Sequence, residues 1–226
     1  MKNEKPHLAE LRIDYDADRL RRADLPEHPL DLLHAWFQLA LDAKIPDPHA
    51  MTLATATSDG QPSSRTVLCK GFDPDTASIE FFTNYESRKG RELAENPKAA
   101  ATFLWHPLQK QVCLRGHTEK LPRENSQAYF DSRPYSSQIG ALTSDQSSPL
   151  TNRDQLDARA AELTARYPEG TPVPLPDHWG GFRLIPEAWE FWQGRPSRLH
   201  DRFLYRLPHP GESPNPAGWI AERLNP

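Results

Sequence analysis

The segment from Trp189 to Arg206, WEFWQGRPSRLHDRFLYR, has the residue types that bind a planar, anionic ligand. Three Trp or Phe side chains come first, and Arg195, Arg198, His200 and Arg202 follow. The last three are two residues apart, and alternate side chains of an extended strand share one face. A strand here would therefore present cationic and titratable groups together, next to aromatic rings. The alternative is a solvated strand face with a few cation–π contacts.

A second cationic group opens a predicted helix over residues 87–95, which Asn96-Pro97 ends. Its first residues are Ser87, Arg88 and Lys89. The helix dipole disfavours cations at this end, so the pair is explained if a phosphate binds the free N–H groups and the side chains close over it. The alternative is that both cations point into solvent.

The segment RTVLCK has a cation at each end of a predicted strand. Strict alternation puts Arg65 and Lys70 on opposite faces, so they would bind two different anions unless a bulge intervenes. A central strand whose cationic ends extend to solvent is the alternative.

A third set of groups suits an oxyanion. Tyr129 and Arg133 are four residues apart and share one face of a predicted helix, and Ser137 follows after a break. A phenol, a guanidinium and a hydroxyl can clamp a phosphate, whereas the alternative is a stacked Tyr–Arg pair on a surface helix. Gln111 and Gln146-Ser147 add neutral groups that can bind the polar edge of a heterocycle.

Motifs for nucleophilic or metal catalysis are missing from the sequence. It contains no GxSxG, no HExxH, no metal-ligand spacing, no Walker glycine loop and no GxGxxG after a strand. The chain is thus rich in phosphate-binding groups and poor in acid–base groups. This balance indicates that an organic cofactor supplies the reactive atoms.

The order of apolar patterns and turns predicts a mainly β (α+β) fold, an antiparallel β-barrel with peripheral helices. We expect a mobile arm or lid over residues 1–28 and one domain over 29–226. Predicted strands cover 51–57, 63–72, 78–83, 99–106, 110–121, 180–185, 187–193, 201–207 and 218–224. Predicted helices cover 29–44, 87–95, 122–132 and 137–142, and a further helix is N-capped by Thr151.

Composition excludes several classes of protein. The net charge of −4 is unlike that of a nucleic-acid-binding protein, so the cationic clusters are local. The polar N-terminus has no signal-peptide pattern, and no apolar run is long enough to cross a bilayer. Cys69 and Cys113 are too few for a disulfide framework or a zinc site. These features predict a cytoplasmic protein with free thiols and no bound metal.

Taken together, these segments resemble the pyridoxamine/pyridoxine 5′-phosphate oxidase family of FMN enzymes. The resemblance runs from about residue 12 to residue 226. Its most specific pieces are RTVLCK (65–70), FFTNYESRKG (81–90), QKQV (109–112), YFDSRPYSSQIGA (129–141), QSS (146–148), WGGFR (179–183) and EFWQGRPSRLHDR (190–202).

The resemblance implies a split β-barrel homodimer with FMN at the subunit interface. The implied FMN contacts are Arg65, Thr66, Val67, Leu68, Cys69, Lys70, Phe82, Thr83, Arg88, Lys89, Gln111, Trp192 and Arg202, with Gln146 and Ser147 from the other subunit. The implied substrate-binding residues are Arg12 and Tyr15 of the lid, the phosphate ligands Lys70, Tyr129, Arg133 and Ser137, and the catalytic pair Arg198 and His200 at the pyridine ring.

The implied reaction is oxidation of pyridoxamine or pyridoxine 5′-phosphate to pyridoxal 5′-phosphate in vitamin B6 synthesis or salvage. A hydride passes from the substrate C4′ to FMN, and O2 is reduced to H2O2. Two alternatives remain: a non-catalytic flavin- or haem-binding protein of the same barrel class, and a flavin reductase that takes hydride from a nicotinamide or deazaflavin.

Overall fold

The structure is a computed structural model, and it describes residues 11, 14–16 and 18–226. The described elements include five α-helices and nine strands. The helices are α1 (Pro29–Asp42), α2 (Arg88–Glu95), α3 (Arg123–Ser132), α4 (Tyr135–Thr143) and α5 (Arg153–Arg166), with short 3-10 helices at Arg22–Asp24, His106–Leu108 and Pro196–Arg198. The strands are β1 (Ala50–Ala56), β2 (Pro62–Leu68), β3 (Gly71–Asp73), β4 (Ser78–Asn84), β5 (Lys98–Trp105), β6 (Lys110–Lys120), β7 (Trp179–Gln193), β8 (Asp201–Arg206) and β9 (Ile220–Leu224).

Two compact units make up the chain. The central unit comprises His49–Phe103 and Cys113–Ala188, and the terminal unit comprises Met1–Pro48, Leu104–Val112 and Trp189–Pro226. Strands β5, β6 and β7 have residues in both units.

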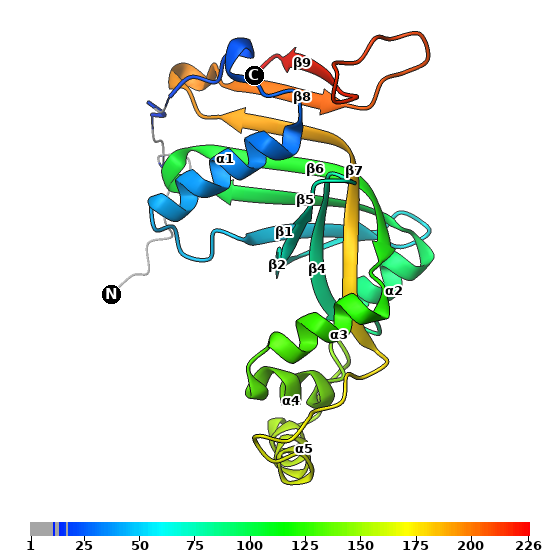
Figure 1. Cartoon of the computed structure of the whole chain (residues 1–226). Helices are drawn as coiled ribbons and strands as arrows, with labels where there is room; N and C mark the ends of the chain where they lie inside the picture. Colours follow the sequence, from blue (N-terminus) through cyan, green and yellow to red (C-terminus); the bar gives the residue numbers. More distant parts are fainter. Residues whose placement is uncertain (1–10, 12–13, 17) are drawn as a thin grey trace, which may run out of the picture. The chain divides into compact units, whose positions relative to one another are not determined.

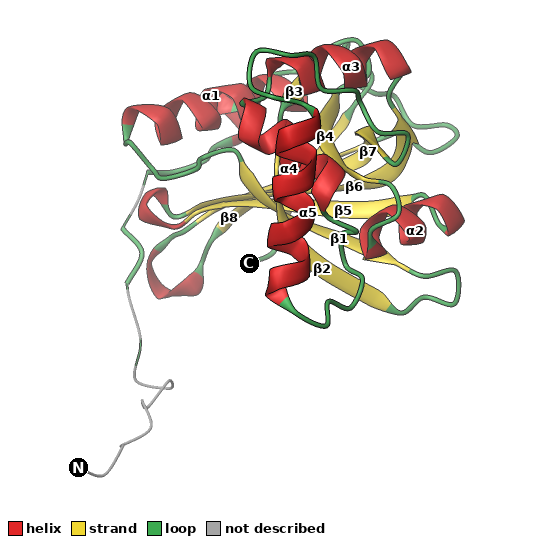
Figure 2. Cartoon of the chain, turned by 90° about the horizontal axis from the view of Figure 1, so that it is seen from below, coloured by secondary structure: helices red, strands yellow, loops and turns green. Residues whose placement is uncertain are grey.

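The central unit is a sheet with strand order β2-β1-β5-β6-β7-β4-β3. Strand β1 pairs antiparallel with β2 and β5, and strand β4 pairs antiparallel with β3 and β7. Helices α2 to α5 lie at the periphery of this sheet (Figure 2). Helices α3 and α4 follow one another, and α4 contacts α5 (Figure 1). A separate apolar cluster lies beneath these helices, formed by Phe130, Ile139, Val173, Leu175 and Trp179.

The terminal unit is organised around helix α1. His28 caps its N-terminus, where the ring Nδ1 accepts a hydrogen bond from the backbone N–H of Leu30 (3.3 Å), and Pro29 occupies the first turn. The apolar face of α1 buries Trp36, whose ring meets Phe191 of β7 edge-on at 5.4 Å. β8 pairs with β7 and, antiparallel, with β9.

The predicted mainly β, antiparallel architecture with peripheral helices is confirmed, but several local predictions are wrong. The predicted strands 180–185 and 187–193 are one strand, β7, which continues through Pro186. The helix cap lies one residue after Thr151, because Asn152 accepts the N–H of Asp154 (3.0 Å).

The third wrong prediction is the strand that would align the cationic groups at 198–202. Residues Pro196–Arg198 form a 3-10 turn, and strand β8 begins only at Asp201. Ser197 and Arg198 have φ values of 57° and 62°, a left-handed conformation that no strand contains. Arg198, His200 and Arg202 therefore do not share a strand face.

Close approach of backbone explains why β6 carries a glycine opposite the β7 proline. A Cβ at Gly116 would overlap the carbonyl oxygen of Ile185 and crowd Pro186. By contrast, a Cβ at Gly140, inside α4, would meet no atom within 4 Å. The two glycines should thus respond oppositely to the same substitution.

We predict that Gly116→Ala lowers the free energy of unfolding by about 1–3 kcal/mol, the usual cost of forced overpacking. Gly140→Ala should raise it by about 0.5–1 kcal/mol, because alanine is the better helix former. Urea unfolding of both variants at one fixed protein concentration measures the difference. Equal stability of the two variants would contradict this account of β6 and β7.

Candidate functional site

A cavity of about 730 Å³ opens in the central unit, a size suited to a small organic ligand. β2, β4, α2 and the α3–α4 region contribute its walls, with Trp179 from the start of β7. Fourteen of the predicted site residues line it: Arg65, Thr66, Val67, Leu68, Lys70, Phe82, Thr83, Arg88, Lys89, Tyr129, Arg133, Ser137, Gln146 and Ser147. The structure thus brings together segments that are up to about eighty residues apart in the sequence.

Positive charge dominates the cavity wall. Five of its lining residues are cationic: Arg65, Lys70, Arg88, Lys89 and Arg133. Within the described part of the chain, no Asp or Glu lines the cavity. Charges removed from water need a partner, so this wall fits a ligand with one or more anionic groups.

Lys89 is the most buried of these cations. It lies in the first turn of α2, and Ser87 caps that turn by accepting the N–H of Gly90 (3.3 Å). The Lys89 ammonium donates to the neutral oxygens of Thr83 (3.0 Å), Ser87 (3.2 Å) and Gln146 (3.0 Å). Its hydrogen bonds are satisfied while its charge is not balanced by them. Burial, aided by the positive charge of Arg65, lowers the pKa of Lys89 to about 8.

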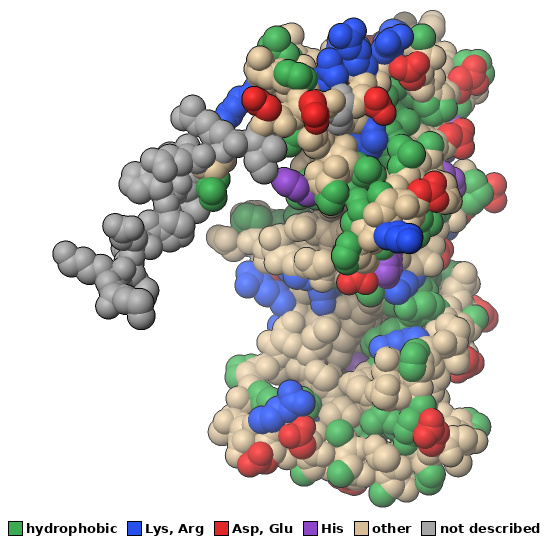
Figure 3. All heavy atoms as spheres, turned by 90° about the vertical axis from the view of Figure 1, so that its left-hand side faces the viewer, with side chains coloured by type: hydrophobic (Ala, Val, Ile, Leu, Met, Phe, Trp, Pro, Cys, Tyr) green, Lys and Arg blue, Asp and Glu red, His purple; other side chains and the backbone are tan. Residues whose placement is uncertain are grey.

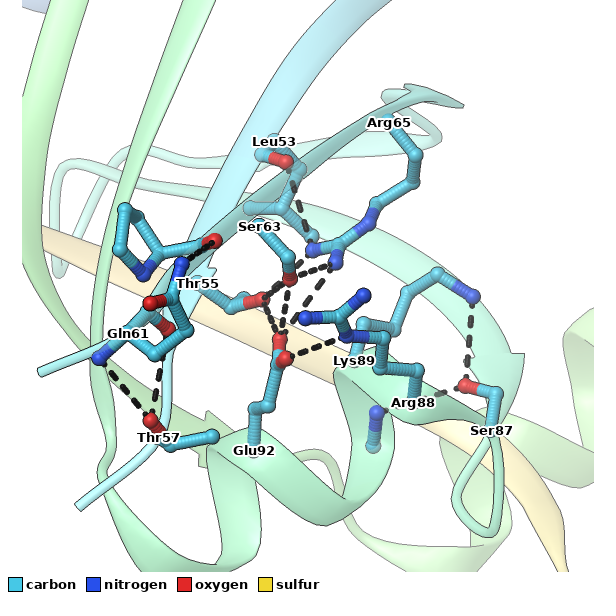
Figure 4. Close-up of polar contacts among 12 residues, drawn as sticks. Leu53, Thr55, Thr57, Gln61, Ser63, Arg65, Ser87, Arg88, Lys89 and Glu92 are labelled. Atoms are coloured by element: carbon cyan, nitrogen blue, oxygen red, sulfur yellow. Dashed lines mark hydrogen bonds and ion pairs between the residues drawn. The ribbon is translucent and has the colours of Figure 1, made fainter. Parts of the chain in front are cut away.

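Arg65 and Arg88 both meet a buried carboxylate behind the cavity wall, Glu92 of α2 (Figure 4). Glu92 accepts hydrogen bonds from Ser63 (2.6 Å), Thr55 and Arg88 Nε (2.9 Å), and Arg65 Nη2 lies 3.4 Å away. Burial opposes its ionisation, but the hydrogen bonds from Ser63, Thr55 and Arg88 outweigh it and lower the pKa of Glu92 to about 2. The carboxylate is therefore ionised and fixes Arg65.

Lys70 and Arg65 line one cavity, although strict strand alternation placed them on opposite faces. The predicted strand 63–72 is interrupted, because β2 ends at Leu68 and β3 begins at Gly71. Lys70 therefore lies between strands, where its Nζ is 3.4 Å from Nε2 of His49. Cys69 is buried beside it and does not line the cavity; burial raises the pKa of its thiol to about 12.

Tyr129, Arg133 and Ser137 meet at the cavity wall as their spacing predicted. Tyr129 is on α3, Arg133 ends that helix, and Ser137 is in the first turn of α4. The Nη1 atom of Arg133 is buried and has no hydrogen-bond partner among the described residues. An unpartnered buried guanidinium nitrogen is costly, so an anion bound here would complete its hydrogen bonding.

Gln146 and Ser147, expected from a partner subunit, lie in the cavity of their own chain. Gln146 Oε1 accepts from Lys89, and Thr83 Oγ1 is 3.3 Å away. Ser147 adopts a left-handed conformation, with φ of 71°. The loop after α4 places Gln146 against Lys89 in the first turn of α2.

A second group of predicted residues lies in the terminal unit. Tyr15, Trp192, Arg198 and His200 line a hollow of about 500 Å³. Tyr15 meets the rings of Trp192 (5.8 Å) and His200 (5.6 Å) edge-on. The other predicted lid residue, Arg12, lies outside the described residues. These contacts place one arm residue against the predicted ring-binding residues of its own chain.

His200 is held in one tautomer. Its Nδ1 accepts the backbone N–H of Arg195 (3.1 Å), so in the neutral ring Nε2 carries the proton and can donate it. Burial, with the charges of Arg198 and Arg202, lowers the pKa of His200. The chain turns at residues 197–198, which have left-handed backbone conformations. This turn lets the backbone N–H of Arg195 reach the His200 ring.

Two further predicted residues, Arg202 and Gln111, also belong to the terminal unit. Arg202 pairs with Glu190 through Nε and Nη2 (both 2.8 Å) and donates from Nη1 to the carbonyl of Asn225 (2.9 Å). Gln111 is half-buried on β6. The roles expected for these residues in cofactor binding stay predictions.

Two residues of the central unit were missed from the sequence. Glu92 is four residues after Arg88 on α2, a spacing that favours an ion pair on a helix and was available as a signal. Trp179 begins the WGGFR segment, but nothing in its spacing connects it with α3.

Charge elsewhere on the surface is mixed. On the face drawn in Figure 3, the Lys and Arg side chains of the described residues form separate groups, and several of these groups have Asp or Glu side chains beside them. No helix in the described part of the chain is both long and apolar enough to span a membrane. Across the same residues, no cluster of three or more His, Cys, Asp or Glu is arranged to hold a metal ion.

Comparison with known proteins identifies the family. The family model described as pyridoxamine 5′-phosphate oxidase matches residues 37–167, and the model described as the pyridoxine 5′-phosphate oxidase C-terminal dimerisation region matches residues 179–226. The chain belongs to the pyridoxamine 5′-phosphate oxidase family. The resemblance inferred from the sequence segments is therefore confirmed.

Members of this family from several bacteria are close to the chain over nearly its whole length. The pyridoxine/pyridoxamine 5′-phosphate oxidase of Paraburkholderia phytofirmans is 51% identical over 97% of this chain and 99% of its own. The corresponding oxidase of Thermobifida fusca is 47% identical over 96% of this chain and 97% of its own. PhzG from Burkholderia lata, solved with tetrahydrophenazine-1-carboxylic acid, has a TM-score of 0.83 at 34% identity, covering 93% of this chain and 99% of its own. The predicted split β-barrel fold of this oxidase family is thereby confirmed.

The Glu92 cluster predicts a specific loss of stability in acid. A carboxyl whose folded pKa is depressed adds stability above its usual pKa near 4.5, and this stability is lost as the pH falls towards 2. Glu92→Gln should therefore be less stable than the wild type by roughly 2 kcal/mol at pH 6. That gap should shrink towards pH 3.

Urea unfolding at pH 6, 4.5 and 3 measures the difference in unfolding free energy between the wild type and Glu92→Gln. The other carboxyls titrate alike in both proteins, so their contributions cancel in this difference. An equally stable Glu92→Gln variant at pH 6, or a gap that is the same at pH 3, would rule out this role for Glu92.

Proposed function

We propose that this protein oxidises pyridoxamine 5′-phosphate, pyridoxine 5′-phosphate or both to pyridoxal 5′-phosphate, with FMN as its cofactor. The observation that carries the proposal is a cavity lined by five cationic residues and by no Asp or Glu of the described chain, because cofactor and substrate both bear a phosphate. Family membership and the names of relatives such as the Paraburkholderia phytofirmans oxidase support the same activity.

The FMN phosphate would be held at the N-terminus of α2. Lys89 offers a buried ammonium whose contacts are neutral, and Arg65 and Arg88 flank it on Glu92. Helix N-termini favour anions, and Ser87 leaves other first-turn N–H groups of α2 for the phosphate. Bound FMN would supply the acceptor for a hydride from the substrate C4′, with O2 as the final acceptor and H2O2 as the second product.

The substrate phosphate would be held by Lys70, Tyr129, Arg133 and Ser137. The buried, unpartnered Nη1 of Arg133 supports this placement, since a phosphate oxygen would satisfy it. A phosphate lies away from the reacting carbon, so its binding energy can fix the pose of the pyridine ring. Hydride transfer requires donor and acceptor atoms within about 3–3.5 Å of each other, which such an anchor can enforce.

Arg198 and His200 are proposed to act at the pyridine ring. The Nε2–H of His200, set by the Arg195 contact, can donate to the ring's phenolic oxygen. Arg198 is exposed and can lie over the face of the ring. Tyr15, which contacts His200, would help cover the bound substrate.

A homodimer is proposed as the active form. The match of residues 179–226 to a C-terminal dimerisation region supports it. The same residues include Arg198 and His200, so the segment that would pair two chains also bears the proposed ring-binding groups.

The alternatives are less well supported by the cavity. A flavin- or haem-binding protein has no need of a second phosphate clamp at Tyr129 and Arg133. A reductase that uses a nicotinamide or deazaflavin has no need of a compact clamp for one phosphate. The presence of both cationic groups in one cavity favours an oxidase of a phosphorylated substrate.

The activity is tested by adding pyridoxamine 5′-phosphate under air to the FMN-loaded protein. We expect formation of pyridoxal 5′-phosphate with equimolar H2O2 release. Arg198→Ala should keep FMN bound but lose roughly 30- to 1000-fold in kcat/KM, the usual cost of a missing positioned donor. A yellow wild-type protein that releases no peroxide with either phosphorylated vitamer would contradict the proposed function.

The low pKa of Lys89 predicts how FMN affinity depends on pH. A bound phosphate favours the ammonium form, so Lys89 is protonated on binding wherever it is neutral in the free protein. Affinity should be constant from pH 7 to about 8 and then fall as the pH rises further towards 9.5.

Quenching of flavin fluorescence measures the affinity, and Lys89→Arg is the matched control because arginine stays charged across this range. The control should lose the decline above pH 8. A decline of the same size in both proteins would contradict the assignment of Lys89.

A further inference from the structure

A stack of three aromatic rings lines the cavity wall next to the proposed substrate phosphate site. The rings of Phe82 and Tyr129 are 3.9 Å apart and inclined by 19°. Trp179 is nearly parallel to both: its ring is 5.7 Å from Phe82 at 15° and 6.1 Å from Tyr129 at 4°. All three residues line the cavity, although Trp179 is only 6% exposed.

The pairing of β4 with β7 sets this stack. Phe82 is opposite Gly181 and Asn84 is opposite Trp179, so Phe82 and Trp179 are diagonal neighbours on one face of the sheet. Gly181 leaves the space that Phe82 occupies, since a Cβ there would lie 2.7 Å from Cε1 of the Phe82 ring. The WGGFR segment thus supplies the Trp179 ring and, at Gly181, the space that the Phe82 ring needs.

Arg133 lies over the same indole. Its guanidinium carbon is 4.8 Å from the centre of the Trp179 ring, and 5.8 Å from that of Phe130. A cation–π contact with a ring uses none of the guanidinium N–H groups as hydrogen-bond donors. One of these groups is the buried Nη1 that has no partner among the described residues. No carboxylate of the described chain forms an ion pair with Arg133.

We propose that Trp179 is a positioning residue for the substrate phosphate: its indole fixes both Arg133 and Tyr129 in the arrangement that grips the phosphate. This inference rests on the proposed function. Burial lowers the pKa of Arg133 and raises that of Tyr129, in keeping with a clamp desolvated before the ligand binds. A guanidinium ordered in advance loses less conformational entropy when the phosphate arrives.

The test measures binding without turnover. Its probe is 4-deoxypyridoxine 5′-phosphate, which has no oxidisable group at C4′, and the comparison ligand is 4-deoxypyridoxine, which lacks the phosphate. Each is titrated against the FMN-loaded wild type, Trp179→Leu and Trp179→Phe. Trp179→Leu should raise the Kd of the phosphorylated probe roughly tenfold, within the range of a desolvated cation–π contact. Trp179→Phe, which keeps a ring, should stay within about threefold of the wild type.

The unphosphorylated ligand should bind all three proteins equally. Unchanged affinity of Trp179→Leu for the phosphorylated probe would overturn the inference, as would an equal loss for both ligands. Trp179→Met fills the space without a ring, so it replaces Trp179→Leu if that variant does not fold.

A matched control separates clamp positioning from packing of the same strands. Phe182, the neighbour of Gly181 on β7, stacks on Phe81 at 5.7 Å and does not line the cavity. Phe182→Leu should lower stability without changing the ratio of the two Kd values. If the wild type oxidises pyridoxamine 5′-phosphate and Trp179→Leu binds the phosphorylated probe as tightly as the wild type does, this inference alone is refuted. A wild type that neither binds the probe nor oxidises the substrate would refute the proposed function as well.

Discussion

The rest of the central unit depends on one constraint: positive charge is held in a cavity to which no described Asp or Glu contributes a wall. A buried ammonium or guanidinium is stable only with hydrogen-bond partners, and Lys89 obtains them from neutral oxygens. Burial of the ammonium, together with the nearby positive charge of Arg65, lowers the pKa of Lys89. An anionic ligand is the component that would balance this charge.

Glu92 makes this arrangement possible from outside the cavity. It neutralises part of the charge of Arg65 and Arg88 from behind, while Thr55 and Ser63 satisfy its own oxygens. An acid at the cavity wall would compete with a phosphate for the same cations. The chain therefore orders its arginines with a carboxylate and still presents them to a ligand.

Much of the site could be predicted from the sequence because residue type and short-range spacing determine it. Tyr129 lies in the last turns of α3, Arg133 is the C-cap residue of that helix, and Ser87 caps α2, so local geometry specifies both features. The turn at Ser197 and Arg198 could not be predicted in this way, because two non-glycine residues in the left-handed conformation have no sequence signal. Trp179 was missed for another reason: its contact with Arg133 depends on the register of β4 and β7 and on α3, which are distant in sequence.

The central claim is that the cations of this cavity bind the phosphate of a flavin. Titration of the cofactor-free protein with FMN and with riboflavin, which share one ring system, tests it most directly. Several charge-assisted hydrogen bonds, each contributing about 1.5–3 kcal/mol, predict that FMN binds at least about a hundredfold more tightly. Equal affinity for the two flavins, or no binding of either, would contradict the account.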